Sequence, residues 1–390
     1  MQLLHVLRKQ YWQIAFFLWL ISFLVIKTPQ WQINFTYLII LAPVLISLNL
    51  AELKKFFSEP LAKCLLLLIF TLVISGFIDG EPLRQAKYGL LVILFYIAVS
   101  RLPNITNKEI WRTAWIFLYC LLLYVGANMV WKFSIGGWLP GDRLVDLWGK
   151  LGNPIYVTDT MTACLAIITF TGIQMRKYRY VLLAHCITLL TGLVVLQTRS
   201  AIPVWLAILG LSWIQTSSYR TKKQTLLFIF AASFIFLIAY SVSSLEIGNK
   251  LLARNVYRPE IWHGYIEESL RCGIWFGCGI GYGFRYISHD GNLMAHAHNI
   301  FVAQFFKAGL IGLAPLFVMS SWAAIYGIKS RVWAGWFFVA GVVALCFDGN
   351  NLIHSPNEYW LLFHLPLALL INQRKHITYS DGSSKPPEIA

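Results

Sequence analysis

Apolar residues fall along the chain in long blocks that are separated by short polar segments. Blocks of about 16 to 25 apolar residues suit helices that cross the hydrocarbon core of a bilayer, whereas a helix of a soluble protein carries only an apolar stripe. The pattern therefore predicts an all-α polytopic membrane protein with about twelve transmembrane helices. We place these spans near residues 12–27, 33–50, 60–78, 85–100, 109–132, 155–174, 180–197, 201–216, 225–243, 299–325, 332–347 and 357–371.

Short basic clusters occupy alternate connections between these spans, and they are Arg8/Lys9, Lys54/Lys55, Arg101/Lys108/Arg112, Arg176/Lys177/Arg179, Arg220/Lys222/Lys223, Lys329/Arg331 and Arg374/Lys375. Because basic connections stay on the cytoplasmic side of a membrane, the alternation places both termini there. The first span lacks the small-x-small site of a cleaved signal peptide, so we expect it to be retained.

The same alternation divides the chain into four parts. Residues 1–243 hold the first spans, and residues 244–298 form one large loop on the side opposite the basic clusters. Residues 299–372 hold the last spans, and residues 373–390 form a polar tail that we expect to be disordered.

Composition supports a membrane protein and argues against nucleic-acid binding. The chain has 390 residues, of which 58% are hydrophobic and only 13% charged, and a soluble domain has about 25% charged residues. The net charge of +15 is spread between the apolar blocks rather than gathered in one domain. The seven cysteines lack metal-site spacing, and whether Cys272 and Cys278 in the large loop form a disulfide stays open.

Two arginines are candidate anion ligands. Arg199 lies in Gln-Thr-Arg-Ser-Ala, between two spans and on the side where positive charge is disfavoured; its ordinary alternative is an interfacial arginine. Arg258 opens Arg-Pro-Glu-Ile-Trp, where Pro259 fits the first position of a helix that would run to about Leu270. A helix N-terminus beside a guanidinium makes an anion site, and Arg254 is a weaker candidate for the same work.

A glycine-rich segment and a histidine complete the set of candidates. The segment Cys-Gly-Ile-Trp-Phe-Gly-Cys-Gly-Ile-Gly-Tyr-Gly is neither a Walker loop nor a Rossmann fingerprint. His298 and Asn299 are followed by nine residues, then Gly309 and, three residues later, Gly312. Eleven helical residues make about three turns, so we expect Gly309 on nearly the same helix face as His298, with both glycines admitting a neighbouring helix. His289 and His296 compete with His298, and Lys307 is a charge inside this stretch.

The pattern His-Asn-x9-Gly-x2-Gly, together with the preceding Arg-x2-Ile-Trp and the glycine-rich segment, resembles the signature of the bacterial O-antigen ligase family. The close resemblance covers about residues 254–313, with Gln197–Ala201 as a second anchor. O-antigen polymerases and protein O-oligosaccharyltransferases share much of this motif. The resemblance implies a multi-pass, GT-C-like protein of the bacterial inner membrane, with its active site facing the periplasm.

The resemblance also implies a reaction. An undecaprenyl-diphosphate-linked O-antigen glycan would be the donor and lipid A–core the acceptor, with no metal and no cofactor. Arg199 and Arg258 would hold the donor diphosphate and His298 would act at the reacting centre, with Arg254, Asn299, Gly309 and Gly312 in support. An activated donor needs no ATP, and a neutral imidazole can take the proton of an acceptor hydroxyl. We therefore expect inversion at the anomeric carbon.

The residues leave alternatives open. A double displacement would need a carboxylate nucleophile, and the candidates are Asp142, Asp159, Asp290, Asp348 and Glu358. An O-antigen polymerase would use a second lipid-linked glycan as its acceptor, and a protein O-oligosaccharyltransferase would use a protein. A transporter should show paired broken helices at the membrane midplane, and the sequence gives no convincing pair.

Overall fold

A computed structural model describes residues 2–78, 80–217, 257–287, 291 and 293–380. The first part is helical throughout, and its elements are α1 (Gln2–Val25), α2 (Pro29–Thr36), η1 (Tyr37–Leu41), α3 (Ala42–Ser47), α4 (Leu50–Ser58), α5 (Pro60–Ile78), α6 (Pro82–Ser100), α7 (Asn107–Ser134), α8 (Pro154–Gln174), α9 (Tyr178–Leu189), η2 (Leu190–Val195) and α10 (Ala201–Ser217).

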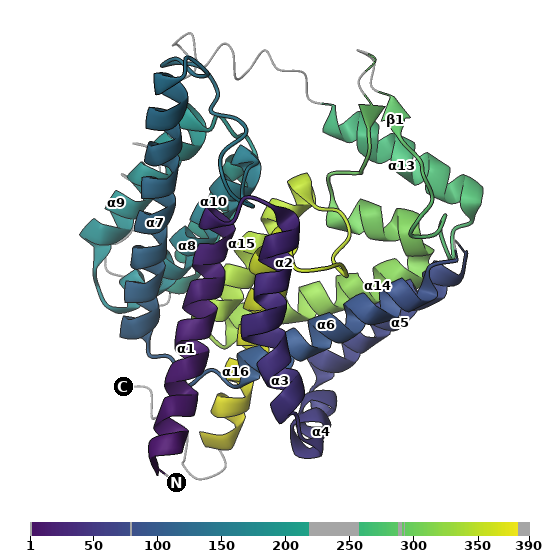
Figure 1. Cartoon of the computed structure of the whole chain (residues 1–390), viewed down its shortest axis with the longest axis horizontal. Coiled ribbons are helices and arrows are strands. Elements are labelled where there is room, and N and C mark those ends of the chain that lie inside the picture. Colours follow the sequence, from purple (N-terminus) through teal and green to yellow (C-terminus); the bar gives the residue numbers. More distant parts are fainter. Residues whose placement is uncertain (1, 79, 218–256, 288–290, 292, 381–390) are drawn as a thin grey trace.

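The second part begins with one helix and a two-stranded sheet and returns to long helices. Its elements are α13 (Arg258–Cys272), β1 (Tyr286–Ile287), β2 (Leu293–Met294), α14 (Ile300–Lys329), α15 (Trp333–Asp348), η3 (Trp360–His364) and α16 (Leu365–Ser380). The two strands pair antiparallel, with Tyr286 opposite Met294. In Figure 1, α13 and β1 lie at the end of the molecule opposite the start of α1 and the end of α16.

Seven of the described helices are long and apolar enough to cross a membrane, and they are Pro29–Ser47, Pro60–Ile78, Pro82–Ser100, Asn107–Ser134, Pro154–Gln174, Tyr178–Val195 and Ile300–Lys329. Three shorter apolar helices cover Gln10–Val25, Ala201–Gln215 and Trp333–Asp348. The expected all-α polytopic architecture is confirmed at this level. The count of about twelve spans remains a prediction, because the span placed at 225–243 lies outside the described residues and the one at 357–371 divides between η3 and α16.

Helix α8 forms the centre of the bundle. It packs against α7, α9, α10 and α15, and nearly all of its residues are buried. Asn153 caps its start by accepting from the Ile155 amide at 3.0 Å, and Pro154 follows at a position where the missing N–H costs little. A polar residue on this helix, such as Asp159, is therefore enclosed by protein rather than by lipid.

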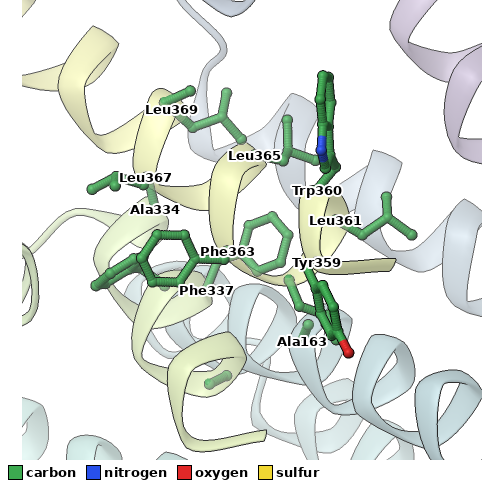
Figure 2. Packing of buried hydrophobic residues seen from close by; sticks show 14 of the residues in the cluster. Ala163, Ala334, Phe337, Tyr359, Trp360, Leu361, Phe363, Leu365, Leu367 and Leu369 are labelled. Carbon is green, nitrogen blue, oxygen red and sulfur yellow. The ribbon is translucent and has the colours of Figure 1, made fainter. Parts of the chain in front are cut away.

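The last helices close the core against α8. Figure 2 shows Phe363 and Trp360 of η3 among buried side chains that include Phe337 of α15 and Ala163 of α8. Gly341 allows η3 to approach α15 closely, because a Cβ there would lie 1.8 Å from the carbonyl oxygen of Leu362. Burial of such large side chains contributes about 1.5–3 kcal/mol each in a water reference, and less against lipid.

The start of the expected disordered tail needs correction. We placed it at Gln373, but α16 continues to Ser380. The reason is local, because neither glycine nor proline occurs between Pro366 and Gly382 and so nothing in the sequence ends the helix earlier. Residues 381–390 lie outside the described part of the chain.

Candidate active site

A cavity of about 660 Å³ opens where α8, α10, α13 and α15 meet. Its lining includes Arg199, Arg258 and His298, the three residues singled out from the sequence, and adds Arg143 and Asp348. Three guanidinium groups, an imidazole and a carboxylate thus share one cavity. Such a site favours an anion that has a reacting atom near the imidazole.

Arg199 is carried by a tight turn that is fastened to α8. Gln197 has a positive φ of 46°, and its side-chain amide donates to the Gly141 carbonyl at 2.9 Å. Thr198 donates to the Thr158 hydroxyl at 2.7 Å, and Ser200 donates to the Asp159 carboxylate at 3.3 Å. The bonds on both sides of Arg199 hold its backbone in place, so the position of its guanidinium depends on its side-chain torsions and not on movement of the turn.

Arg143 was missed by the sequence analysis. It comes from the connection between α7 and α8, and its Nε donates to the Leu196 carbonyl at 3.2 Å, next to the turn that carries Arg199. The signal available in the sequence was a basic residue in a connection on the side where positive charge is disfavoured. That signal also applies to other residues, so only the fold separates Arg143 from them.

Arg258 begins α13, and Pro259 follows it in the first turn as the sequence predicts. The helix ends at Cys272, two residues beyond the expected Leu270. Arg258 interacts attractively with Asp159, a fully buried carboxyl group on α8. The first turn of α13 and its guanidinium therefore face the same cavity as the turn at Arg199. Arg254 lies outside the described residues.

His298 is held by a buried carboxylate. Its Nδ1 lies 2.5 Å from Oδ1 of Asp348, the last residue of α15, and the two side chains are 23% and 2% exposed. When Nδ1 donates to Asp348, Nε2 keeps its lone pair and can accept a proton. Asp348 was only one of five carboxylates weighed from the sequence. Its position at the end of an apolar span was the available signal.

His296, one of the two competing histidines, packs beside His298 with ring centroids 4.0 Å apart. Burial lowers the pKa of His296 to about 4, and the charges of His298 and Lys307 add to that effect. His296 is therefore neutral over the ordinary working range of pH. The other competitor, His289, lies outside the described residues.

The expected placement of His298 on a helix face is wrong. Helix α14 begins at Ile300, and Asn299 caps it by accepting from the amides of Phe301 at 2.9 Å and Val302 at 3.2 Å. His298 precedes the cap with a positive φ of 53°. Because the cap requires extended backbone at Asn299, the chain turns sharply there and directs His298 toward α15.

Gly309 also differs from its expected role. Its φ of 58° and ψ of −158° interrupt α14, and the break receives the glycine-rich segment instead of a neighbouring helix. The Cys278 amide donates to the Phe306 carbonyl at 2.7 Å, and the Leu310 amide donates to the Ile274 carbonyl at 2.9 Å. A Cβ at position 309 would lie 2.3 Å from the Trp275 backbone. Gly312 instead faces Ala308 and Gln304 of its own helix.

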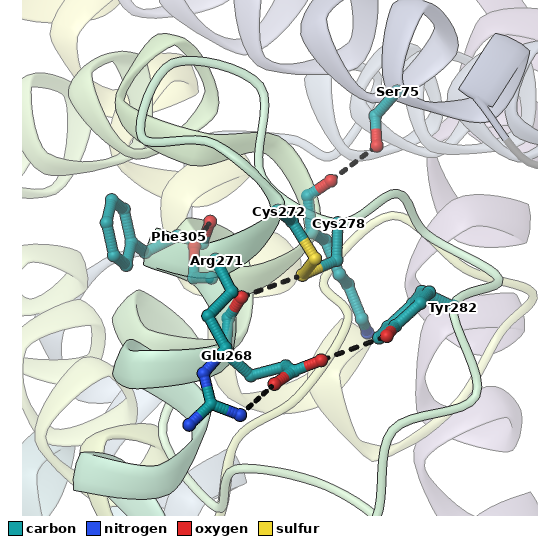
Figure 3. The surroundings of a disulfide bond; sticks show 9 residues. Ser75, Glu268, Arg271, Cys272, Cys278, Tyr282 and Phe305 are labelled. Carbon is teal, nitrogen blue, oxygen red and sulfur yellow. Dashed lines mark hydrogen bonds and ion pairs between the residues drawn. A yellow bond between two sulfur atoms is a disulfide. The ribbon is translucent and has the colours of Figure 1, made fainter.

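A disulfide between Cys272 and Cys278 closes the segment that fills this break, with Cα atoms 4.9 Å apart. Figure 3 shows the bond beside Glu268, which accepts from the Tyr282 hydroxyl at 2.9 Å. The pairing left open by the sequence is therefore formed. The disulfide links the end of α13 to the glycine-rich segment, and that segment is hydrogen bonded to α14. The helix that begins with Arg258 and the helix that follows His298 are therefore connected.

One group among the described residues has donor atoms close enough to share a metal ion, and it consists of His296, His298 and Asp348, within 4.8 Å of one another. The same proximity follows from the hydrogen bond between His298 and Asp348 and from the ring contact. The expectation of a metal-independent reaction remains a prediction to be tested directly.

Comparison with known proteins bears on the resemblance. No protein-family profile matches the chain. The chain is 28% identical over 296 residues to an O-antigen ligase of Pseudomonas aeruginosa, an alignment that covers 73% of this chain and 69% of that protein. Together with the apolar helices, this similarity supports a multi-pass membrane protein that resembles an O-antigen ligase. The resemblance to the O-antigen ligase family, first seen around His298, is thereby confirmed.

Proposed function

We propose that this protein transfers an O-antigen glycan from undecaprenyl diphosphate to lipid A–core at the periplasmic face of the bacterial inner membrane. The observation that carries the proposal is the convergence of Arg199, Arg258 and His298, with Asp348, on one cavity. The similarity to an O-antigen ligase supports the class of reaction. Donor, acceptor and stereochemistry are part of the proposal.

The arginines bind the leaving group. Arg199 and Arg258, with Arg143 beside them, face the cavity from three different segments. Guanidinium groups bind phosphate oxygens in pairs of parallel hydrogen bonds, and an ammonium group does not. As the bond between the anomeric carbon and the diphosphate oxygen breaks, negative charge grows on the diphosphate. Donors already in place offset that charge without further reorganisation.

His298 removes the proton of the acceptor. Asp348 orients the ring through Nδ1, and Nε2 takes the hydroxyl proton while the acceptor oxygen bonds to the anomeric carbon. Undecaprenyl diphosphate departs in the same displacement, so the anomeric configuration inverts. Asp348 is hydrogen bonded to His298 and nearly fully buried, which favours a positioning role over attack on the sugar. Asp159 is fully buried as well.

Reconstitution tests the proposal. The purified protein in liposomes, given undecaprenyl-diphosphate glycan and lipid A–core, should yield a product whose mass equals acceptor plus glycan. A chelator should leave the rate unchanged, and nuclear magnetic resonance of the new linkage should show inversion. A lengthened lipid-linked glycan, with no glycan on lipid A–core, would instead identify a polymerase.

The membrane orientation can be tested separately. Ile287 is exposed at the end of β1, and we place this unit in the periplasm with both termini in the cytoplasm. In a variant without other cysteines, Ile287→Cys should react with an impermeant thiol reagent in intact cells whose outer membrane is permeable. Reaction only after the inner membrane is opened would reverse the topology.

A further inference from the structure

A second polar cluster lies around Lys307, on α14. Its ammonium donates to the Asn350 side chain at 2.8 Å, and Asn350 follows Asp348 by two residues. His354 lies in the same connection and stacks on Tyr88 of α6, with ring centroids 4.8 Å apart. These four residues, Tyr88, Lys307, Asn350 and His354, are all partly exposed, and we call them the Lys307 cluster.

The charge of Lys307 is not balanced by a carboxylate among the described residues. Its hydrogen-bond partner is a neutral amide. Two nearby cations differ in this respect, because Lys150 pairs with Glu358 at 3.2 Å and Arg84 pairs with Glu81 at 2.8 Å. An ionisable residue in an apolar helix is costly and marks a substrate or ion site unless a partner offsets it.

The positive charge of Lys307 lowers the pKa of two nearby histidines. Burial lowers the pKa of His354, and the charges of Lys307, Arg84 and Lys150 lower it further. Lys307 also contributes to the lowered pKa of His296, whose ring packs on His298. Both neighbours therefore remain neutral, and an anion bound beside Lys307 would favour the charged form of its amine.

The cluster is separate from the arginine cavity. Lys307, Asn350 and His354 are not among the described residues that line that cavity, whereas His298 and Asp348 are. Lys307 acts electrostatically on His296, whose ring packs on His298, so the cluster lies near His298 but outside the lining of the arginine cavity. A displacement at the anomeric carbon brings the acceptor to the face opposite the leaving diphosphate, so the two substrates need separate anion sites.

We propose that the Lys307 cluster binds a phosphate group of the acceptor glycan. The proposal rests on the proposed function and names a specificity determinant for its second substrate. Lys307 and Asn350 contact the anion, and the face formed by Tyr88 and His354 packs against the adjoining sugar. This subsite holds the acceptor hydroxyl in reach of His298.

The test compares lipid A–core before and after enzymatic removal of its phosphates. Lys307→Met should raise the KM for phosphorylated acceptor about tenfold or more, since a lost charge-assisted hydrogen bond is worth about 1.5–3 kcal/mol. The KM for the donor should stay within about twofold. Lys307→Arg should recover most of the affinity for phosphorylated acceptor. The KM of the wild-type protein for dephosphorylated acceptor should be as high as the KM of Lys307→Met for phosphorylated acceptor.

Lys132→Met is the matched control. Lys132 lies in the last turn of α7, does not line the arginine cavity and is not a member of the Lys307 cluster. It should behave as wild type with both acceptors. If Lys307→Met does not fold, inorganic phosphate replaces the variant as the probe and should compete with the phosphorylated acceptor but not with the dephosphorylated one.

Several outcomes overturn the subsite. A fall in kcat with an unchanged acceptor KM would make Lys307 a positioning residue for the Asp348 connection. Equal effects on both acceptors would leave no role for an acceptor phosphate, and a raised donor KM would assign the lysine to the diphosphate. If wild-type protein ligates neither acceptor, the proposed function itself fails, and that result differs from all of these.

Discussion

Two groups of basic residues near His298 are built in different ways. In the arginine cavity, Arg143, Arg199 and Arg258 extend from connections and from a helix start. In the Lys307 cluster, Lys307 projects from inside α14, close to the break at Gly309. Arginines at chain turns can be placed without disturbing a span, whereas a charge within a span needs an interrupted or enclosed helix. The first arrangement suits a diphosphate, and the second suits a single anion.

The largest effect should come from His298. His298→Ala should lower the rate on the order of a hundredfold or more, the scale of a lost general base, without loss of donor binding. His296→Ala and His289→Ala, assayed at matched expression, should retain most activity. Because the pKa of His296 is about 4, its ring is already neutral near pH 7, and His296→Ala should leave the pH dependence of the rate above about pH 5 unchanged. An inactive His296→Ala beside an active His298→Ala would reassign the base.

Replacement of Arg199 or Arg258 should give the next largest effect. Arg199→Ala and Arg258→Ala should each remove most activity, about tenfold to a hundredfold, because each deletes a charged hydrogen-bond donor. Lysine at either position should restore only part of the rate, since it lacks the bidentate fork. Arg285→Ala, at an exposed position just before β1, is the control. Normal ligation by both alanine variants at normal protein levels would remove the diphosphate site.

Asp348 is expected to contribute less than the groups that touch substrate. Asp348→Asn keeps a hydrogen-bond partner for His298 but removes the charge that stabilises the imidazolium. We expect kcat to fall about tenfold or more, with the KM of both substrates little changed. Asp142→Asn, at an exposed position, serves as the control. If Asp348→Asn were as active as wild type, the contact at Nδ1 would not orient the ring.

The smallest effect should come from the disulfide. Cys272→Ser with Cys278→Ser should lower the free energy of unfolding by about 2 kcal/mol, measured as a lower Tm, and should reduce activity only a few-fold. Cys120→Ser, which replaces a free cysteine, should change neither. A loss of activity as large as that of His298→Ala would mean that the loop is needed to form the site and does more than stabilise it.

The sequence was sufficient for features that depend on local composition. Apolar length predicts the spans, Pro259 predicts the start of α13, and the motif around His298 indicates the family. It failed at His298 and Gly309, where an uninterrupted helix was assumed. A glycine with positive φ and one with helical φ look the same in a sequence, and what distinguishes them here is the backbone of Trp275 against Gly309.

Several features were decided only by the tertiary structure. Arg143 and Asp348 join the site because the connection between α7 and α8 and the end of α15 both reach the cavity, and no local sequence pattern encodes which distant segments will meet. The pairing of Cys272 with Cys278 depends on how the glycine-rich segment folds back onto α14. Likewise, Lys307 acquires Asn350 from the connection after α15, and His354 of that connection stacks on Tyr88 of α6. Span length and capping are short-range properties of the chain, whereas the meeting of charges depends on packing between distant segments.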